Sequence, residues 1–303
     1  MILPRHVPRV SIGVPVYNGE RYLGEALDSL LGQSFEDFEL IICDNASTDR
    51  TGDIGRSYAS KDHRICYVRN ETNLGLARNY GRTFELSSGE YFGWHAADDL
   101  SAAGSLARCV AVLDRQPAVV LAYPKTQLID EAGRITSDYD DGLHLQAARP
   151  SERFQQLLER VGYVNALYGL MRSAVMRRTR LLKGFPGADI VFLAELSLYG
   201  TFWEIPEFLF YRRFHSEASS NMDRTRLRAL WSPNGNRRIY LHEWKHLLEL
   251  VRAVARAPLN TMEKVRAGRF LARRAIWRRT ELVRELAAAV RELATGGARQ
   301  ERR

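Results

Sequence analysis

The sequence of 303 residues has little cysteine and no closely spaced cysteine pair. Its three cysteines are Cys43, Cys66 and Cys109, and their separation excludes a Cys-x-x-Cys redox centre or a zinc-ribbon site. Cys43 and Cys66 lie in apolar, strand-like runs, so we expect both to be small core residues. A chain with this cysteine usage is typical of a reducing compartment.

Long hydrophobic runs are also absent. No uncharged stretch approaches the ~18 residues that a membrane-spanning helix needs. The first nine residues contain Pro4 and Pro8 and no apolar core of a signal peptide. We therefore expect a cytoplasmic protein.

Lysine is scarce, and positive charge is unevenly distributed. Only five of the 44 basic residues are lysine, and no basic, aromatic-rich sheet motif accompanies the arginines, so we expect no nucleic-acid partner. The net charge of +8 arises from residues 222–303, where 20 basic side chains face 8 acidic ones. The remaining 221 residues carry 24 basic and 28 acidic side chains. The excess positive charge thus indicates an anionic partner for the C-terminal segment alone.

Short apolar runs alternate with helix-like segments along the first 125 residues. The predicted strands are residues 10–16, 38–43, 64–69, 91–94 and 118–123, and the predicted helices are residues 20–32, 49–60, a segment opening at 73–79, and 101–116. This alternation predicts an α/β fold with a mostly parallel, doubly wound sheet. In such sheets ligands bind beyond the carboxyl ends of the strands.

Polar clusters follow four of these strands, at residues 17–20, 44–49, 73–78 and 98–99. All four would lie at the same edge of a parallel sheet, which favours a nucleotide site. The first strand is not followed by Gly-x-Gly-x-x-Gly, and no Gly-Lys-Ser/Thr loop occurs. The site is therefore neither the dinucleotide-binding nor the P-loop design.

The fourth cluster, Asp98-Asp99, ends a buried strand at residues 91–94. Two adjacent carboxylates repel each other and lose hydration when buried, so a cation is expected beside them. Oxygen ligands at this position suit Mg²⁺ or Mn²⁺ carrying phosphate oxygens. The alternative is an Asp-Asp cap for the helix predicted at residues 101–116.

Three of the loops together resemble the motifs of family 2 glycosyltransferases, which have the GT-A nucleotide-sugar-binding fold. The matching segments are residues 14–20 (VPVYNGE), 43–49 (CDNASTD) and 73–79 (NLGLARN), with Asn45 and Ala46 as mild departures. Their order and spacing carry the resemblance, which runs from about residue 10 to residue 220. It implies a catalytic domain at residues 1–221, with a nucleotide-binding half (1–125) and an acceptor half (126–221). A basic helical extension would occupy residues 222–303.

The resemblance also implies a donor-binding set. Pro15, Tyr17 and Glu20 would line the nucleotide pocket, Asp44 would accept a hydrogen bond from the base, and Arg78 would face the diphosphate. A carboxylate suits an N–H of the base, and an arginine suits phosphate. Without the family, Tyr17 is equally well explained by packing at the rim and Arg78 by a surface helix charge.

The metal site departs from the family pattern. Many members have a carboxylate where this chain has Ala96, so the resemblance leaves Asp98 as the metal ligand and Asp99 as its neighbour, shaping the site or touching the sugar. His215 resembles a family histidine that supplies another ligand, although a lone histidine is more often structural. The implied cofactor is Mg²⁺ or Mn²⁺.

Asp189 resembles the catalytic base of the family, which removes the proton of an acceptor hydroxyl. A single displacement would then invert the anomeric centre. The alternative role for Asp189 is to cap the helix predicted at residues 190–199. The implied reaction moves a sugar from a nucleotide-diphospho-sugar to a hydroxyl of a glycan or lipid-linked acceptor. The competing hypothesis is a non-catalytic protein of the same fold that binds a membrane or a partner through its arginine-rich tail, and the missing carboxylate at Ala96 supports it.

The tail predicts two helices, at residues 236–256 and 261–293. The second combines a cluster of arginines and aromatic residues with an apolar stripe formed by Ile276, Val283, Leu286, Val290 and Leu293. Such a helix fits attachment to anionic lipid at the inner face of the membrane. The alternative is a helical pair packed on the catalytic domain. Upstream, the polar segment 137–150 is the best candidate for a mobile loop.

Overall fold

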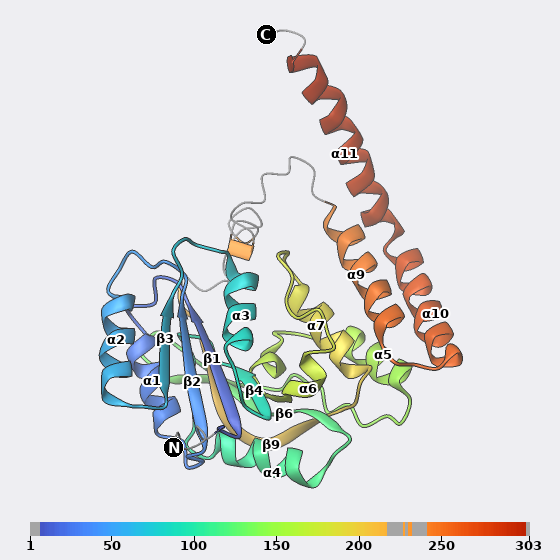
Figure 1. Ribbon diagram of the computed structural model, residues 1–303. Helices are drawn as coiled ribbons and strands as arrows, with labels where there is room; N and C mark the ends of the chain where they lie inside the picture. The colour runs from blue at the N-terminus through green and yellow to red at the C-terminus, as the bar shows by residue number, and fades with distance from the viewer. Residues whose placement is uncertain (1–6, 217–226, 228–229, 232–240, 301–303) are drawn as a thin grey trace, which may run out of the picture.

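The computed structural model describes residues 7–216, 227, 230–231 and 241–300. One twisted sheet runs through the body of the molecule, helices cover both of its faces, and three C-terminal helices lie along one side (Figure 1).

The first half forms the parallel part of the sheet. Its elements are β1 (Val10–Val16), α1 (Leu23–Leu31), β2 (Phe38–Asp44), α2 (Thr51–Lys61), β3 (Ile65–Arg69), α3 (Leu76–Glu85) and β4 (Tyr91–Trp94). The strands lie in the order β3-β2-β1-β4, all parallel. β1 and β4 are buried along their whole length, which explains their continuous apolar sequence. The predicted alternation is confirmed, with element ends shifted by a few residues.

The second half extends this sheet with strands of both directions. Its elements are β5 (Leu100–Ser101), α4 (Ser105–Arg115), β6 (Val119–Ile129), β7 (Ile135–Tyr139), α5 (Pro150–Arg160), the 3₁₀ turn η1 (Asn165–Tyr168), β8 (Leu170–Arg172), α6 (Ser173–Met176), α7 (Ala188–Ser197) and β9 (Thr201–Arg213). β8 lies antiparallel between β4 and β6, and β9 pairs parallel with β6. β9 is a single strand of 13 residues.

Three expectations from the sequence are wrong in detail. The helix predicted from residue 101 begins at Ser105, because Leu100 and Ser101 pair with β9 instead. The segment 137–150 begins as strand β7 and buries Leu143 and Leu145 completely, so it is not a free loop. Cys66 is exposed on β3, at the outer edge of the sheet.

The alternation of side chains along β4 divides the core into two layers. Tyr91 packs with α1 and α4 on one face, together with Leu27 and Leu113. Phe92 and Trp94 point to the other face, where α3, α5 and α7 pack. Trp94 donates a hydrogen bond through its indole N–H to Tyr80 O (3.1 Å), so its polar atom is satisfied inside the core.

The C-terminal helices are α9 (His242–Arg256), α10 (Thr261–Trp277) and α11 (Arg279–Gln300). α9 and α10 pack against α5 and α7 and extend the second core layer, chiefly through Leu250, Val254, Phe270 and Leu271. α11 continues past the rest of the molecule (Figure 1). The predicted domain boundary at residues 221 and 222 lies outside the described residues, as does the predicted helix start at residue 236. Among the residues that the structure describes, no helix is long and apolar enough to cross a bilayer.

Candidate active site

The carboxyl ends of β3, β2, β1 and β4 form one edge of the sheet. Val16 of β1 pairs with Asp44 of β2, which pairs with Arg69 of β3. On the other side of β1, the amide of His95, just after β4, donates to Gly13 O (2.9 Å). The polar loops after these strands therefore lie side by side, as the sequence predicts.

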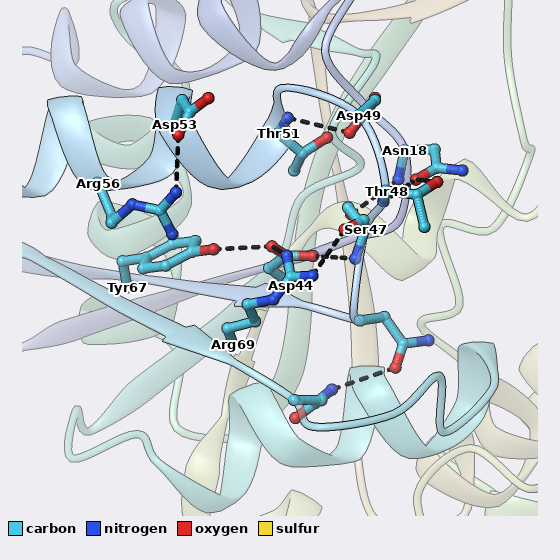
Figure 2. Close-up of polar contacts among 12 residues, drawn as sticks. Asn18, Asp44, Ser47, Thr48, Asp49, Thr51, Asp53, Arg56, Tyr67 and Arg69 are labelled. Carbon is cyan, nitrogen blue, oxygen red and sulfur yellow. Dashed lines mark hydrogen bonds and ion pairs between the residues drawn. The ribbon is translucent and has the colours of Figure 1, made fainter.

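Asp44 is the centre of a hydrogen-bonded network at this edge (Figure 2). Its carboxylate accepts from Ser47 N (2.8 Å), Tyr67 Oη (2.7 Å) and Arg69 Nη1 (2.7 Å). Burial alone would raise the pKa of Asp44, but these hydrogen bonds outweigh it and hold the pKa below its ordinary value. Asp44 is therefore a fully buried carboxylate fixed in position.

The loops after β1 and β2 hold each other through side-chain contacts. Asn18 N donates to Ser47 Oγ (2.9 Å), and Asn18 Oδ1 accepts from Thr48 N (2.8 Å). Glu20 accepts a hydrogen bond from Arg50 N (2.9 Å). Tyr17 stays 44% exposed at the mouth of this double loop, whereas Pro15 is buried within β1. Tyr17 and Glu20 thus face the solvent side, where a ligand could reach them.

A chain of amide side chains fastens the third loop to the second. Asn45 Nδ2 donates to Asn73 Oδ1 (2.9 Å). Asn70 Nδ2 donates to Asn79 Oδ1 (2.8 Å), and Asn79 Nδ2 donates to Cys43 O (2.8 Å). Arg78, next to Asn79 in the first turn of α3, is exposed. The amides are absent from the predicted site, although their clustering in two motif loops was visible in the sequence.

Asp98 lies against His215, 117 residues later in the chain. His215 Nε2 is 2.9 Å from Asp98 Oδ2, and the imidazole packs on the ring of Tyr22 with centroids 5.1 Å apart. The imidazole is buried, but Asp98 keeps 36% of its side chain exposed. The two predicted metal ligands are thus adjacent and open to solvent on the carboxylate side.

Arg213 holds in place the loop that contains Asp98 and Asp99, here called the aspartate loop. Its backbone N donates to Asp99 Oδ1 (2.8 Å), and its Nε donates to Asp98 O (2.9 Å). The guanidinium is completely buried and forms an ion pair with Glu25 Oε2 (2.7 Å) while also donating to Glu131 O (3.0 Å). Arg213 was not among the predicted site residues. The sequence feature that could have indicated its role is the pair Arg212-Arg213 at the end of β9, because consecutive strand residues point to opposite faces.

Asp99 points inward, away from solvent. Burial raises its pKa well above the usual carboxyl range, and the neighbouring charge of Asp98 raises it further. Asp98 and Asp99 therefore differ in their surroundings: one carboxylate is open and paired with a histidine, and the other is enclosed.

The donor set around Asp98 fits a hard divalent cation. A carboxylate oxygen and an imidazole nitrogen are both common ligands of Mn²⁺, and Mg²⁺ needs only one or two protein ligands when diphosphate and water complete the shell. Within the described part of the chain, no group of three or more His, Cys, Asp or Glu side chains converges to form an all-protein metal cage.

Asp189 lies in the first turn of α7, two residues after Gly187, which adopts a left-handed φ of 83°. Asp189 Oδ1 accepts from Ile190 N (2.9 Å), so the carboxylate helps to satisfy the start of the helix. Burial raises its pKa, and the positive charge of Arg212 partly opposes this rise. A carboxylate with a raised pKa is a better proton acceptor than an ordinary aspartate.

Arg212 connects the two parts of the site. Its Nη1 donates to Tyr163 O and to Asn165 Oδ1, both at 2.7 Å, and its guanidinium packs on the rings of Tyr163 and Phe214. Burial raises the pKa of both Asp99 and Asp189, and the charge of Arg212 lowers both. The positive charge of Arg212 therefore acts on both of these carboxyl groups.

Comparison with known proteins identifies the family. The family model described as glycosyl transferase family 2 matches residues 11–182. An uncharacterized glycosyltransferase of Haemophilus influenzae is 28% identical over 223 residues, which cover 71% of this chain and 68% of that protein. A second uncharacterized glycosyltransferase, from Rickettsia typhi, is 28% identical over 239 residues, covering 74% of this chain and 71% of that protein.

Solved structures share the fold at low sequence identity. Residues 1–349 of Staphylococcus aureus TarS in complex with UDP-GlcNAc align with a TM-score of 0.64 at 16% identity, covering 94% of this chain and 81% of TarS 1–349. A mannosyltransferase of Pyrobaculum calidifontis in complex with GDP-Man and Mn²⁺ aligns with a TM-score of 0.55 at 19% identity, covering 97% and 81%. These neighbours confirm the GT-A architecture expected from the motifs. The family model matches more than half of this chain, and the chain therefore belongs to glycosyl transferase family 2.

Proposed function

We propose that this glycosyltransferase is an inverting, metal-dependent enzyme that moves a hexosyl group from a nucleotide-diphospho-sugar to a hydroxyl of a glycan or lipid-linked acceptor. The observation that carries the proposal is the convergence at the end of β9. Arg213 donates to the Asp98-Asp99 loop and His215 pairs with Asp98, while the charge of Arg212 lowers the pKa of both Asp99 and Asp189. A cation-binding pair and a carboxylate suited to proton removal would then belong to one site.

The donor nucleotide would bind at the sheet edge between the first three loops. Tyr17 and Glu20 are accessible there, Pro15 shapes the end of β1, and Arg78 is exposed on the side of α3. Asp44 already accepts three protein hydrogen bonds. Because Asp44 is fully buried, an N–H of the base would have to replace one of these donors, and the Arg69 side chain, 42% exposed, is the one that lies at the surface.

Asp98 and His215 would hold Mg²⁺ or Mn²⁺ against the diphosphate. The bound cation supplies positive charge that stabilises the departing nucleoside diphosphate. Asp98 has no local substitute, because Ala96 and Ala97 precede it. Asp99, enclosed and bonded to the backbone of Arg213, would shape the sugar side of the site.

Asp189 would act as the general base. It would accept the proton of the acceptor hydroxyl as that oxygen attacks the anomeric carbon from the face opposite the diphosphate. General-base catalysis of this kind contributes roughly 10²–10⁴-fold in rate. The attack occurs in a single displacement, so the anomeric configuration is inverted.

The tail would bring the enzyme to an anionic membrane surface on the cytoplasmic side. The exposed face of α10 carries Val265, Arg269, Arg273 and Trp277, and the guanidinium of Arg273 lies over the Trp277 ring at 5.0 Å. Arginines beside exposed apolar side chains match the interface of an anionic bilayer. The opposite face of α10 is buried, so the packed-helix alternative also describes part of the tail.

We predict that Asp98→Ala removes metal-dependent donor binding and nearly abolishes transfer. Thermal shifts with UDP-, GDP- and dTDP-sugars, each with and without Mn²⁺, measure binding directly. A ligand at 100 times its dissociation constant stabilises the fold by about 2.7 kcal/mol. Asp53→Ala, at an exposed aspartate of α2 paired with Arg56, is the matched control and should keep the Mn²⁺-dependent shift.

Two outcomes would contradict this assignment. An Asp98→Ala variant that still binds donor more tightly with Mn²⁺ places the cation elsewhere. A wild-type protein that binds a donor sugar but neither transfers nor hydrolyses it with Mn²⁺ supports the non-catalytic alternative, for which the alanine at position 96 is the motivating feature.

A further inference from the structure

The distal part of α11 carries an apolar stripe that nothing in the described chain covers. Val283, Leu286, Val290 and Leu293, together with Ile276 at the end of α10, keep between 41% and 65% of their surface exposed. The proximal part of α11 is attached to the molecule: Leu282 is buried, and the Glu285 carboxylate accepts from Glu243 N at the start of α9 (2.9 Å). Beyond this attachment the helix extends away from the body (Figure 1).

The spacing within the stripe is that of a helical coiled coil. Val283, Leu286, Val290 and Leu293 follow one another at intervals of three, four and three residues, and Ile276 precedes Val283 by seven residues, across the break between α10 and α11 at Arg278. β-Branched residues occupy one heptad position and leucines the other. This combination favours two-stranded, parallel coiled coils. Two heptads are short for an independent coil, but here one end is already anchored to a folded domain.

A projecting helix of this kind needs a partner. α11 has 22 residues, and even for helices of this length most stability in proteins comes from packing an apolar face. The exposed stripe of α11 provides such a face. An occupant would stabilise the helix and remove the stripe from water.

The charges of α11 favour a second helix over a lipid surface. From Arg279 to Leu293 the helix has three arginines and three glutamates, arranged as mixed pairs such as Arg284-Glu285 and Arg291-Glu292. Two such helices do not repel each other, whereas a helix that lies on anionic lipid is rich in Lys and Arg on its polar face. The exposed face of α10 meets that lipid criterion and α11 does not. Ala287 and Ala289 flank the stripe and allow close approach of a neighbouring backbone.

We propose that α11 pairs with α11 of a second copy of this chain, through Ile276, Val283, Leu286, Val290 and Leu293. Side chains of this size each contribute on the order of 100 Å² of apolar surface. Five per copy would bury roughly 1,000 Å² in total, which is at the lower limit for specific interfaces. The dimer is therefore weak and forms in the micromolar range of protein concentration.

Sedimentation velocity of the full chain across a concentration series tests the proposal. The wild-type protein should shift from monomer to dimer between about 1 and 100 μM. Val290→Glu places a charge in the centre of the stripe and should remain monomeric throughout. Ala288→Glu adds the same charge on the opposite face of the same helix and should dimerise like the wild type. Both variants should keep the wild-type melting temperature, since these positions are exposed.

Three results would overturn the inference. A wild-type protein that stays monomeric at 100 μM excludes the dimer. Equal loss of dimer in Val290→Glu and Ala288→Glu shows that charge, not the stripe, is responsible. In a parallel arm with phosphatidylcholine–phosphatidylglycerol vesicles, loss of co-sedimentation by Val290→Glu from a protein that never dimerises assigns the stripe to lipid.

Discussion

At the scale of single residues, the end of β9 organises the candidate active site. Consecutive residues of a strand point to opposite faces, so Arg213 turns into the body and Arg212 turns toward Asn165. The buried guanidinium of Arg213 is paired with Glu25 and also bonded to two backbone carbonyls. Glu25 keeps 59% of its side chain exposed, so removing it would cost chiefly by leaving the buried guanidinium with one partner fewer. One strand end thereby fixes the aspartate loop and supplies His215.

We predict that Asp189→Asn leaves donor affinity close to that of the wild type and lowers turnover by about 10²–10⁴-fold, the usual effect of losing a general base. The amide oxygen can still accept from Ile190 N, so the fold should survive. Initial rates at saturating donor measure turnover, and thermal shifts measure donor binding. Burial raises the pKa of Asp189, so this carboxylate becomes protonated at a higher pH than an ordinary aspartate. Acidification should therefore begin to lower wild-type activity at a correspondingly higher pH.

Glu195→Gln serves as a comparison, since that buried carboxylate is paired with Arg256 and is expected to support the fold. It should lower the melting temperature more than it lowers turnover. Normal turnover in Asp189→Asn would move the base to another side chain.

Glu204 gives a prediction about stability and pH. Burial raises its pKa to about 7, and its neighbour Asp140 contributes to the rise. In the unfolded chain the same carboxyl titrates near 4.5, so the folded state binds its proton more tightly. The protonated Glu204 therefore stabilises the folded state fully below pH 4.5, and this contribution to the free energy of unfolding is lost as pH rises toward 7.

We therefore expect the free energy of unfolding of Glu204→Gln, relative to that of the wild type, to be higher at pH 8 than at pH 4.5. The difference should be on the order of 1–3 kcal/mol, since one pKa unit corresponds to about 1.4 kcal/mol. Urea unfolding at the two pH values measures it. The exposed Glu207→Gln should show no such difference, and an equal response of both variants would rule out Glu204 as the source.

Among the secondary-structure elements, α10 has one buried face and one exposed face. Phe270 is buried and packs edge-to-face on Phe154 of α5, with centroids 6.3 Å apart. Asn260 caps the helix by accepting from Glu263 N (2.9 Å), and Glu263 in turn accepts from Ser151 N (2.9 Å) at the start of α5. The cap and the core contact together join the tail to the catalytic half.

We predict that Phe270→Ala lowers the free energy of unfolding by about 3–5 kcal/mol, the usual cost of truncating a buried phenylalanine. Trp277→Ala, on the exposed face of the same helix, should change it by less than about 0.5 kcal/mol. Chemical denaturation of both variants makes the comparison. Equal, small effects would mean that α10 is not part of the cooperative core.

At the scale of the whole molecule, exposed apolar side chains and positive charge gather in the C-terminal helices. The exposed large apolar residues of this region are Trp244, Leu248, Val251, Met262, Val265, Ile276, Trp277, Val283, Leu286, Val290 and Leu293. The body has only five such residues among those described. Truncation after Ser220 would remove α9 and α10 and expose their core contacts, so substitutions are the better probe of membrane binding.

We predict that the full chain co-sediments with phosphatidylcholine vesicles containing phosphatidylglycerol, and that Arg269→Gln with Arg273→Gln weakens this binding by about 10–30-fold. Each basic residue at an anionic surface contributes about 1 kcal/mol. Arg56→Gln with Arg134→Gln, at exposed sites of the body, is the charge-matched control and should have little effect. Salt at 0.5 M should release the protein. No sedimentation of the wild type at low salt would end the membrane hypothesis.

The order of strands and helices in the first half and the place of the motif loops follow from local patterns of the sequence. Buried parallel strands require continuous apolar runs, and the polar loops follow each strand directly, so both signals are local. Asp98 and His215, 117 residues apart, could be paired only through the family resemblance, and the structure places them 2.9 Å from each other.

Other features depend on contacts between segments that are distant in the sequence, and these features become visible only in the tertiary structure. β8 is only three residues long, and it is a strand because β4 and β6 flank it. Cys66 is exposed because β3 is the edge strand, a fact that its apolar neighbours in sequence do not carry. Both α10 and α11 have apolar residues at helical spacing, yet α10 buries Ala267, Phe270 and Leu271 against the body while the distal part of α11 extends beyond it. Periodicity specifies that a helix has an apolar face, but only the position of neighbouring elements determines whether that face is covered.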